Sequence, residues 1–139
     1  MLKRVIKREL LNGKTTFRTS INIHNIIILR FNILKNRKDI KPDIFSINSV
    51  IKAHANTRDK KGALKYFKLI DDYNLTPDLI TMNAMIHVCG QVGDHQLAEK
   101  FYDMMLIIGI TPDLFTMNSM ISGIIITIIL LSSLYDYYL

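Results

Sequence analysis

The strongest constraint on the fold is a motif that recurs every 35 residues along the chain. A Pro-Asp step and the five residues after it, of which the last is Asn, occur at 42–48, 77–83 and 112–118. All three prolines of the sequence lie in these copies, at the same offset. A fixed period of this length is typical of stacked supersecondary units, because each unit buries its apolar face against a neighbour. The period therefore predicts a solenoid whose function lies on one face, at equivalent positions of successive repeats.

Each repeat unit is predicted to be a helical hairpin. Apolar side chains recur at the spacing of one helix face over 47–54 and again over 63–70, with the polar turn 57–60 between them. The next unit repeats this pattern over 82–89 and 98–105. Proline fixes φ, and the residue before it avoids the helical region, so the second helix of each unit must end before the Pro-Asp step. The predicted fold class is all-α, a right-handed α-solenoid of helix-turn-helix hairpin repeats.

Five segments are predicted along the chain. They are a basic amphipathic N-terminal segment (1–20), a degenerate helical repeat (21–43), two complete repeats (44–78 and 79–113), and a truncated or atypical repeat with an apolar tail (114–139). The formal net charge of +6 is unevenly spread over them, since residues 1–41 hold 11 of the 18 basic residues. The repeats themselves therefore have no positive excess that would bind nucleic acid by bulk electrostatics.

The first 20 residues have the character of a mitochondrial transit peptide. They contain six basic residues against the single acid Glu9, with apolar residues at helical spacing and several Thr and Ser. The alternative is a basic helix that closes or flanks the array. We therefore expect a mitochondrial location, with the cytoplasm as the alternative.

The sequence departs from the repeat pattern after Gly123. An uncharged apolar run, 124–134, stands where a polar turn and a second helix are expected. A transmembrane helix is one interpretation, although the run is at the short end of the ~17–25 residues required. A buried terminal helix that covers the last hairpin is another. We favour a third, in which the chain is a fragment or its reading frame is mis-assigned after Gly123, and we therefore do not expect a membrane partner.

The repeat motif resembles pentatricopeptide repeats. The resemblance rests on the period, the terminal Pro-Asp, the Asn five residues into each unit, and the Ala and Phe or Tyr of the second helix. It covers 44–78 and 79–113, and 114–123 as the opening of a third unit. In this family each repeat reads one RNA base. The resemblance implies sequence-selective binding of single-stranded RNA, in support of organellar RNA processing, stability or translation, with possible protein partners. A helical-repeat adaptor that binds a protein segment is the alternative.

The resemblance also implies which residues read the RNA. The base-recognition residues are Asn48 with Asp78, Asn83 with Asp113, and Asn118 as the start of a third pair. Residues expected against the base planes are Phe45, Ile80 and Phe115, and Lys52 is the expected phosphate contact. In the family's code an Asn/Asp pair favours uracil and, to a lesser degree, cytosine. A carboxamide offers both a donor and an acceptor, which complement the O4 and N3–H of uracil.

A structural interpretation of the same residues stays open. Asp and Thr at the start of a helix are common capping residues, so Asp78, Thr81, Asp113 and Thr116 are also plausible caps. Asn in a first turn can be an ordinary local polar residue. The recurrence of Asn at one register in three copies favours base recognition.

The sequence predicts no catalytic, metal or cofactor site. His87 and Cys89 are two residues apart on one predicted helix and point in different directions, without a further ligand in the pattern. Cys89 falls on the apolar stripe, where packing is the expected role. A single cysteine also excludes an internal disulfide framework. We therefore expect a binding protein and not an enzyme.

Overall fold

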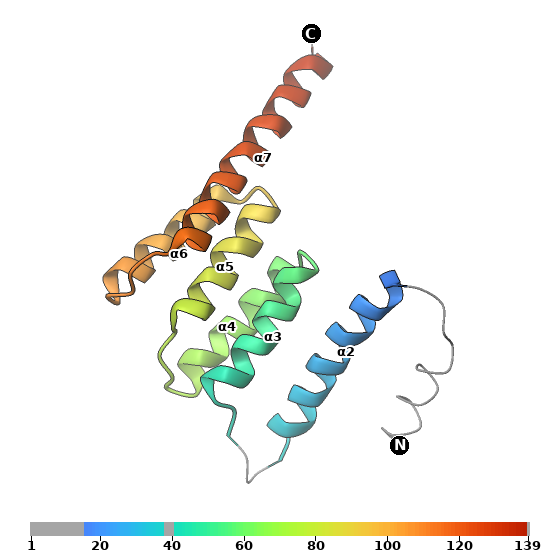
Figure 1. Cartoon of the computed structure of the whole chain (residues 1–139), viewed down its shortest axis with the longest axis vertical. Coiled ribbons are helices and arrows are strands. Elements are labelled where there is room, and N and C mark those ends of the chain that lie inside the picture. The colour runs from blue at the N-terminus through green and yellow to red at the C-terminus, as the bar shows by residue number, and fades with distance from the viewer. Residues whose placement is uncertain (1–15, 38–40, 139) are drawn as a thin grey trace.

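The computed structural model describes residues 16–37 and 41–138, which form six helices and contain no strand (Figure 1). The helices are α2 (Thr16–Lys35), α3 (Ile44–Asn56), α4 (Lys60–Asp72), α5 (Leu79–Gln91), α6 (His95–Ile107) and α7 (Leu114–Tyr138). Helices α2, α3, α5 and α7 follow one another as packed neighbours, and α4 and α6 each form a hairpin with the helix before them. The predicted all-α repeat solenoid is confirmed.

Aspartates fix where five of the six described helices begin, and Asp113, the cap of α7, is described with the site below. Asp43 and Asp78 precede α3 and α5, and each carboxylate accepts a hydrogen bond of 2.8 Å from the backbone N–H three residues later. Asp59 and Asp94 cap α4 and α6 in the same way. An aspartate here satisfies a free N–H of the first turn and places a negative charge at the positive end of the helix dipole. The local sequence therefore sets the start of each helix.

The turns also repeat at the 35-residue period. Arg58 and Gly93 follow the first helix of each hairpin with positive φ angles of 56° and 74°, and Asn74 and Gly109 follow the second with 53° and 80°. A left-handed residue at the end of a helix lets the chain reverse direction within a few residues. The two hairpins therefore have the same geometry.

The apolar stripes predicted from the sequence meet between the helices as a continuous core. The largest fully buried side chains include Ile47, Ile51, Ile70, Met82, Met85, Ile86 and Met105. Cys89 belongs to this core, and burial raises the pKa of its thiol to about 12. The thiol is therefore a packing group, as its place on the apolar stripe predicts.

The two hairpins fill one equivalent space with different residues. In the first, His54 Nδ1 lies 2.9 Å from Asp59 Oδ2, and its ring stacks on Tyr66 with the centroids 5.2 Å apart. A Cβ atom at Gly62 would lie only 2.1 Å from His54 Nδ1. In the second hairpin the equivalent positions hold Cys89 and Leu97. The first hairpin therefore fills this space with a large imidazole next to a glycine, and the second fills it with a small thiol next to a leucine.

Acidification is expected to destabilise the fold through two histidines, the buried His54 and the half-buried His87. Burial lowers the pKa of both His54 and His87, although the hydrogen bond that His54 donates to Asp59 partly offsets it at His54. A histidine with a folded pKa below its unfolded value of about 6.5 binds a proton more readily in the unfolded chain. Its contribution is fully present above pH 6.5 and is lost as the pH falls through the folded pKa.

Urea unfolding, followed by circular dichroism at pH 7.5 and at pH 5.5, measures this effect. The free energy of unfolding should be smaller at pH 5.5, and the difference should shrink in a His54→Gln variant because glutamine does not titrate. The caps Asp43, Asp59 and Asp94 do not contribute to this window, since their hydrogen bonds lower the pKa of each carboxyl from its ordinary value. A pH dependence unchanged in the variant would contradict the assignment to His54.

Helix α2 covers the N-terminal side of the first hairpin. Phe31 is buried and meets the ring of Tyr66 edge-on, with the centroids 5.4 Å apart. The hydroxyl of Tyr66 donates a hydrogen bond of 3.3 Å to Asn32 Oδ1. The helix begins at Thr16 and so crosses the boundary predicted between residues 20 and 21. Most of the predicted transit segment, residues 1–15, lies outside the described residues.

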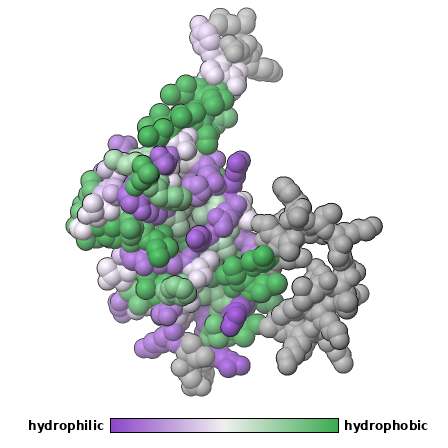
Figure 2. Space-filling view, viewed as in Figure 1, coloured by the Kyte–Doolittle hydropathy of each residue, from purple (hydrophilic) through white to green (hydrophobic). Residues whose placement is uncertain are grey.

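Helix α7 runs on without the expected break. Its first part packs on α5, where Thr116, Ser119 and Gly123 are buried. Beyond them it continues as an apolar rod, in which Thr127 still donates a hydrogen bond of 3.1 Å to the Gly93 oxygen, and then projects from the body (Figures 1 and 2). Its exposed side chains there are Ile124, Ile125, Ile128, Ile129, Leu130 and Leu131, each with at least half of its surface in solvent. The interpretation of a wholly buried terminal helix is therefore wrong for 124–131.

Length and composition alone would let one segment of the described chain cross a membrane. This segment is Leu114–Ser133, and 17% of its apolar window is buried. This segment includes the turns of α7 that pack on α5, so its first half is already in contact with another helix of the same chain.

Candidate nucleic-acid interface

The first predicted pair forms a direct contact between neighbouring hairpins. Asn48 lies on α3, and Asp78 is the residue that caps α5. Asn48 Nδ2 donates to both carboxylate oxygens of Asp78, at 2.9 and 3.1 Å. The hydroxyl of Thr81 donates to Asn48 Oδ1 at 2.6 Å. The amide of one repeat is therefore held at both ends by the first turn of the next.

The second predicted pair repeats this arrangement. Asn83 Nδ2 donates to both oxygens of Asp113 at 3.1 Å, and the hydroxyl of Thr116 donates to Asn83 Oδ1 at 2.5 Å. We call each such set of Asn, Asp and Thr a polar clamp. Asn48 and Asn83 are only 5% and 9% exposed, and both threonines are fully buried.

Capping and pairing are not alternatives in these residues. Asp113 caps α7 through the backbone N–H of Thr116 at 2.8 Å and also accepts from Asn83. The hydrogen bond from the Thr116 backbone N–H, followed by that from Asn83, lowers the pKa of the Asp113 carboxyl. The carboxylate therefore stays ionised at neutral pH and acts as an acceptor toward both partners. Capping therefore does not exclude a further role for these residues.

The clamp leaves part of each amide free. A carboxamide has two N–H groups and an oxygen with two lone pairs. The two oxygens of one carboxylate are too close together to accept from both N–H groups, which diverge, so one N–H of Asn48 is shared between them. The hydroxyl of Thr81 uses one lone pair of the amide oxygen. One donor and one acceptor position remain for a ligand.

An exposed apolar side chain accompanies each first helix of the row. Phe45, Ile80 and Phe115 are 74%, 52% and 49% exposed, three residues before Asn48, Asn83 and Asn118. Residues three apart on a helix lie on the same side of it. Each asparagine therefore has an exposed apolar neighbour of the kind that a planar base can pack against.

The remaining predicted residues lie along the same row of helices. Lys52 is exposed on α3, one turn after Asn48. The equivalent residue of the next repeat is His87, whose ring centroid lies 5.2 Å from that of Phe115. Asn118 is exposed on α7, where its backbone oxygen accepts from the Ser122 hydroxyl. Within the described residues its side chain forms no clamp.

Thr81 and Thr116 are the members of the site that sequence reasoning did not assign to RNA. A threonine three residues after an aspartate is an ordinary capping pattern, so the sequence explains it without a ligand. The available signal was that both threonines recur at one fixed offset, four residues after the proline of the Pro-Asp step.

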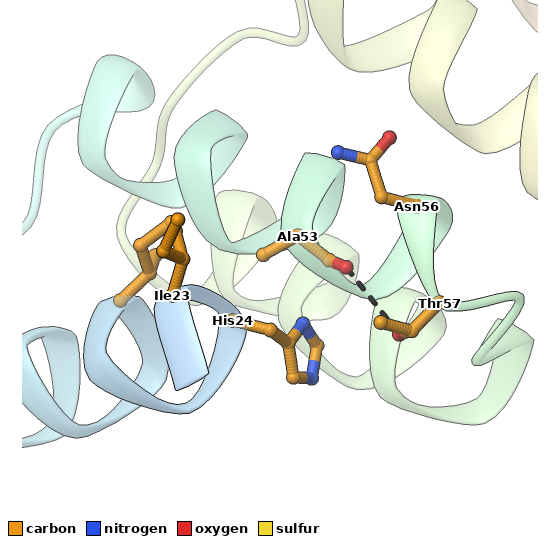
Figure 3. Close-up of a pocket in the computed structure, with 6 residues that line it drawn as sticks. Ile23, His24, Ala53, Asn56 and Thr57 are labelled. Atoms are coloured by element: carbon orange, nitrogen blue, oxygen red, sulfur yellow. Dashed lines mark hydrogen bonds between the residues drawn. The ribbon is translucent and has the colours of Figure 1, made fainter. Parts of the chain in front are cut away.

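A separate small pocket lies between α2 and α3 (Figure 3). Its volume is about 250 Å³, and its lining residues are Ile23, His24, Ile27, Ala53, Asn56 and Thr57. None of the residues predicted to bind RNA lines it. Across the parts of the chain that the structure describes, no group of three or more His, Cys, Asp or Glu side chains could hold a metal ion.

Comparisons with known families agree with the repeat assignment. The model of the PPR repeat family matches residues 77–125, and that of the pentatricopeptide repeat domain matches residues 33–91. Together they span 33–125, about two thirds of the chain. No curated protein sequence matches the chain significantly.

Solved structures share the fold. The crystal structure of the pentatricopeptide repeat protein PPR10 in complex with an 18-nt psaJ RNA element matches with a TM-score of 0.65 and 18% identity. The match covers 98% of this chain and 20% of that one, and a PPR10 variant with three cysteine-to-serine changes matches equally well. The chain thus spans about a fifth of the length of these structures. From the period, the stacked hairpins and the two family matches, we conclude that the chain belongs to the pentatricopeptide repeat family.

Proposed function

We propose that the row formed by α3, α5 and α7 binds single-stranded RNA, with one base at each polar clamp. The observation that carries this proposal is the duplicated clamp, in which a nearly buried asparagine keeps one donor and one acceptor free beside an exposed apolar side chain. The fold that this chain shares with RNA-bound PPR10 supports it.

The preferred base is uracil, followed by cytosine. Thr81 Oγ1 lies 2.9 Å from Asp78 Oδ1, so both partners lie on one edge of the Asn48 amide, and its free N–H and free lone pair point apart. Uracil presents both an acceptor, O4, and a donor, N3–H, so it can pair with whichever of these two groups faces the base. Adenine and cytosine both present their donor and acceptor in the opposite order on the corresponding edge, so the second place of cytosine rests on the pairing code that the family resemblance implies. The base plane packs on Phe45 or Ile80 in the first clamp, and on Ile80 or Phe115 in the second. Lys52 is placed to meet a phosphate.

RNA binding by fluorescence anisotropy tests this proposal. The full chain should bind a U-rich strand at least about thirtyfold more tightly than an A-rich one at near-physiological salt, because two well-paired bases each contribute ~1–3 kcal/mol of discrimination. Replacing Asn48 and Asn83 together with alanine should bring the ratio close to one.

A double variant with Asn25→Ala and Gln96→Ala is the matched control. Both residues are exposed, on α2 and α6, so the variant removes two carboxamides outside the clamps. It should keep the U preference. Equal and weak binding of both RNAs, lost on adding salt, would contradict base reading and favour the adaptor that binds a protein segment.

The cellular role follows as a further part of the proposal. The basic, acid-poor first 20 residues favour mitochondrial import, and we place the function in the processing, stability or translation of transcripts there. A fluorescent protein fused to the C-terminus should co-localise with mitochondria and should lose this location when residues 1–20 are removed. A location that does not depend on these residues would contradict their targeting role.

A further inference from the structure

We propose that Thr81 and Thr116 are positioning residues that fix the orientation of the asparagine amides and thereby set the base preference. The proposal rests on the proposed RNA-binding function. An amide turned by 180° about its last bond has almost the same shape but exchanges its donor and its acceptor. Only the hydrogen-bond network around it determines which pattern meets the base.

Each clamp provides the two groups needed to select one orientation. Asp78 can only accept, so the NH₂ end of Asn48 must face it. Thr81 donates to the other end, the oxygen, at 2.6 Å. With the amide reversed, the oxygen would face a carboxylate and the NH₂ group would face a hydroxyl that already accepts from the Asp78 backbone N–H at 3.2 Å.

The orientation of the Asn48 amide depends on which acceptor receives the single proton of the Thr81 hydroxyl. Thr81 Oγ1 also lies 2.9 Å from Asp78 Oδ1, so its proton has a second possible acceptor. Ser46 occupies the equivalent position in the first copy of the motif, where its hydroxyl lies 2.7 Å from Asp43 Oδ1. Without a neighbouring asparagine, a hydroxyl at this position therefore lies against the aspartate that caps its own helix. Where the preceding repeat supplies an asparagine, the hydroxyl donates its proton to that amide oxygen.

The second clamp is an independent instance of the same arrangement. Thr116 donates to Asn83 Oδ1 at 2.5 Å and lies 2.9 Å from Asp113 Oδ1, and it too is fully buried. The hydroxyl therefore has no route to the RNA itself. Its effect on the base must pass through the orientation of Asn83.

The side-chain amide resonances of the free protein test the positioning role without RNA. In ¹H–¹⁵N spectra, Thr81→Val should shift the side-chain N–H pair of Asn48 and leave that of Asn83 in place. Thr116→Val should do the reverse, so each variant is the control for the other. Thr81→Ser keeps the hydroxyl and should restore the wild-type positions. Resonances of Asn48 that do not respond to Thr81→Val would overturn the proposal.

RNA selectivity tests the consequence for base reading. Each Thr→Val change should lower the preference for U-rich over A-rich RNA by about fivefold, the contribution of one ordinary hydrogen bond. Thr→Ser should recover most of it. A loss of stability alone would weaken binding to both RNAs equally and leave the ratio unchanged, which would overturn the role in selectivity.

The two measurements separate failure of the positioning role from failure of the proposed function. If the wild-type chain shows no U preference, RNA reading is contradicted, while the amide resonances still decide whether the threonines orient the asparagines. Thr81→Ala removes the hydroxyl without crowding the site, so it gives the same comparison should the valine variant not fold.

Discussion

Replacing Gly62 with leucine is expected to disrupt the first hairpin, and replacing His54 with cysteine in the same chain is expected to restore it. A Cβ at Gly62 would lie 2.1 Å from His54 Nδ1 and 2.4 Å from Asp59 Oδ2, so any larger side chain expels the imidazole. Overpacking of this kind costs ~1–3 kcal/mol or more. The gain in helix propensity over glycine, ~1 kcal/mol, does not offset it.

The second hairpin explains why the double change should succeed. Its equivalent positions hold Cys89 and Leu97, and both are packed in the core. The backbone N–H of Gly62 and that of Leu97 donate to the capping aspartate in the same way, at 2.9 and 3.2 Å. The backbone at this position therefore accepts either residue, and only the neighbouring side chain decides between them.

A double-mutant cycle by urea unfolding measures this coupling. His54→Cys alone should also destabilise the chain, because it leaves a void and breaks the bond to Asp59. The double variant should be more stable than the sum of the single effects predicts, by ~1–3 kcal/mol. Strictly additive effects would show that the two residues do not share one space.

Replacing Gly90 with alanine is the second change with a large expected effect. Helices α5 and α7 cross at Gly90 and Gly123, and a Cβ at Gly90 would lie 2.6 Å from the backbone oxygen of Ser119. A backbone oxygen in a helix cannot move aside as a side chain can, so α7 must shift as a whole. We expect a loss of ~1–3 kcal/mol in the free energy of unfolding, where a free helix position would gain ~1 kcal/mol from the same change.

The shift should also have a local signature. Because Thr116 lies on α7, separation of α7 from α5 should disturb the side-chain resonances of Asn83 and leave those of Asn48 unchanged. Gln96→Ala, at an exposed position on α6, controls for a substitution that adds no contact. An increase in stability on Gly90→Ala would contradict the close crossing.

Much of the fold follows from the sequence because its determinants are local. A proline cannot lie inside these helices and an aspartate caps them, so the bounds of α3 and α5 follow from the Pro-Asp steps. The contacts of Asn48 with Asp78 and of Asn83 with Asp113 follow from the period once the family is known. The threonines could not be assigned in this way, since a cap accounts for them fully without reference to a neighbouring repeat.

The features missed by the sequence depend on contacts between distant residues. The repeat pattern is lost after Gly123, where a polar turn and a second helix are expected from the sequence, yet Gly123 lies inside α7 and packs against Gly90. The run after it has neither proline nor a polar turn to end the helix, so α7 continues to Tyr138. The pairing of His54 with Gly62 is likewise invisible along the chain, because each residue alone suits its helix.

The polar clamps change where one functional module ends and the next begins. Asn48 belongs to the hairpin of α3 and α4, but the groups that orient it, Asp78 and Thr81, lie across the junction with the next hairpin. A reading unit therefore runs from the asparagine of one repeat to the first turn of its successor. An array rebuilt by exchanging repeats at their Pro-Asp steps would divide every reading unit. Exchange at a cut three residues further on would transfer each unit whole.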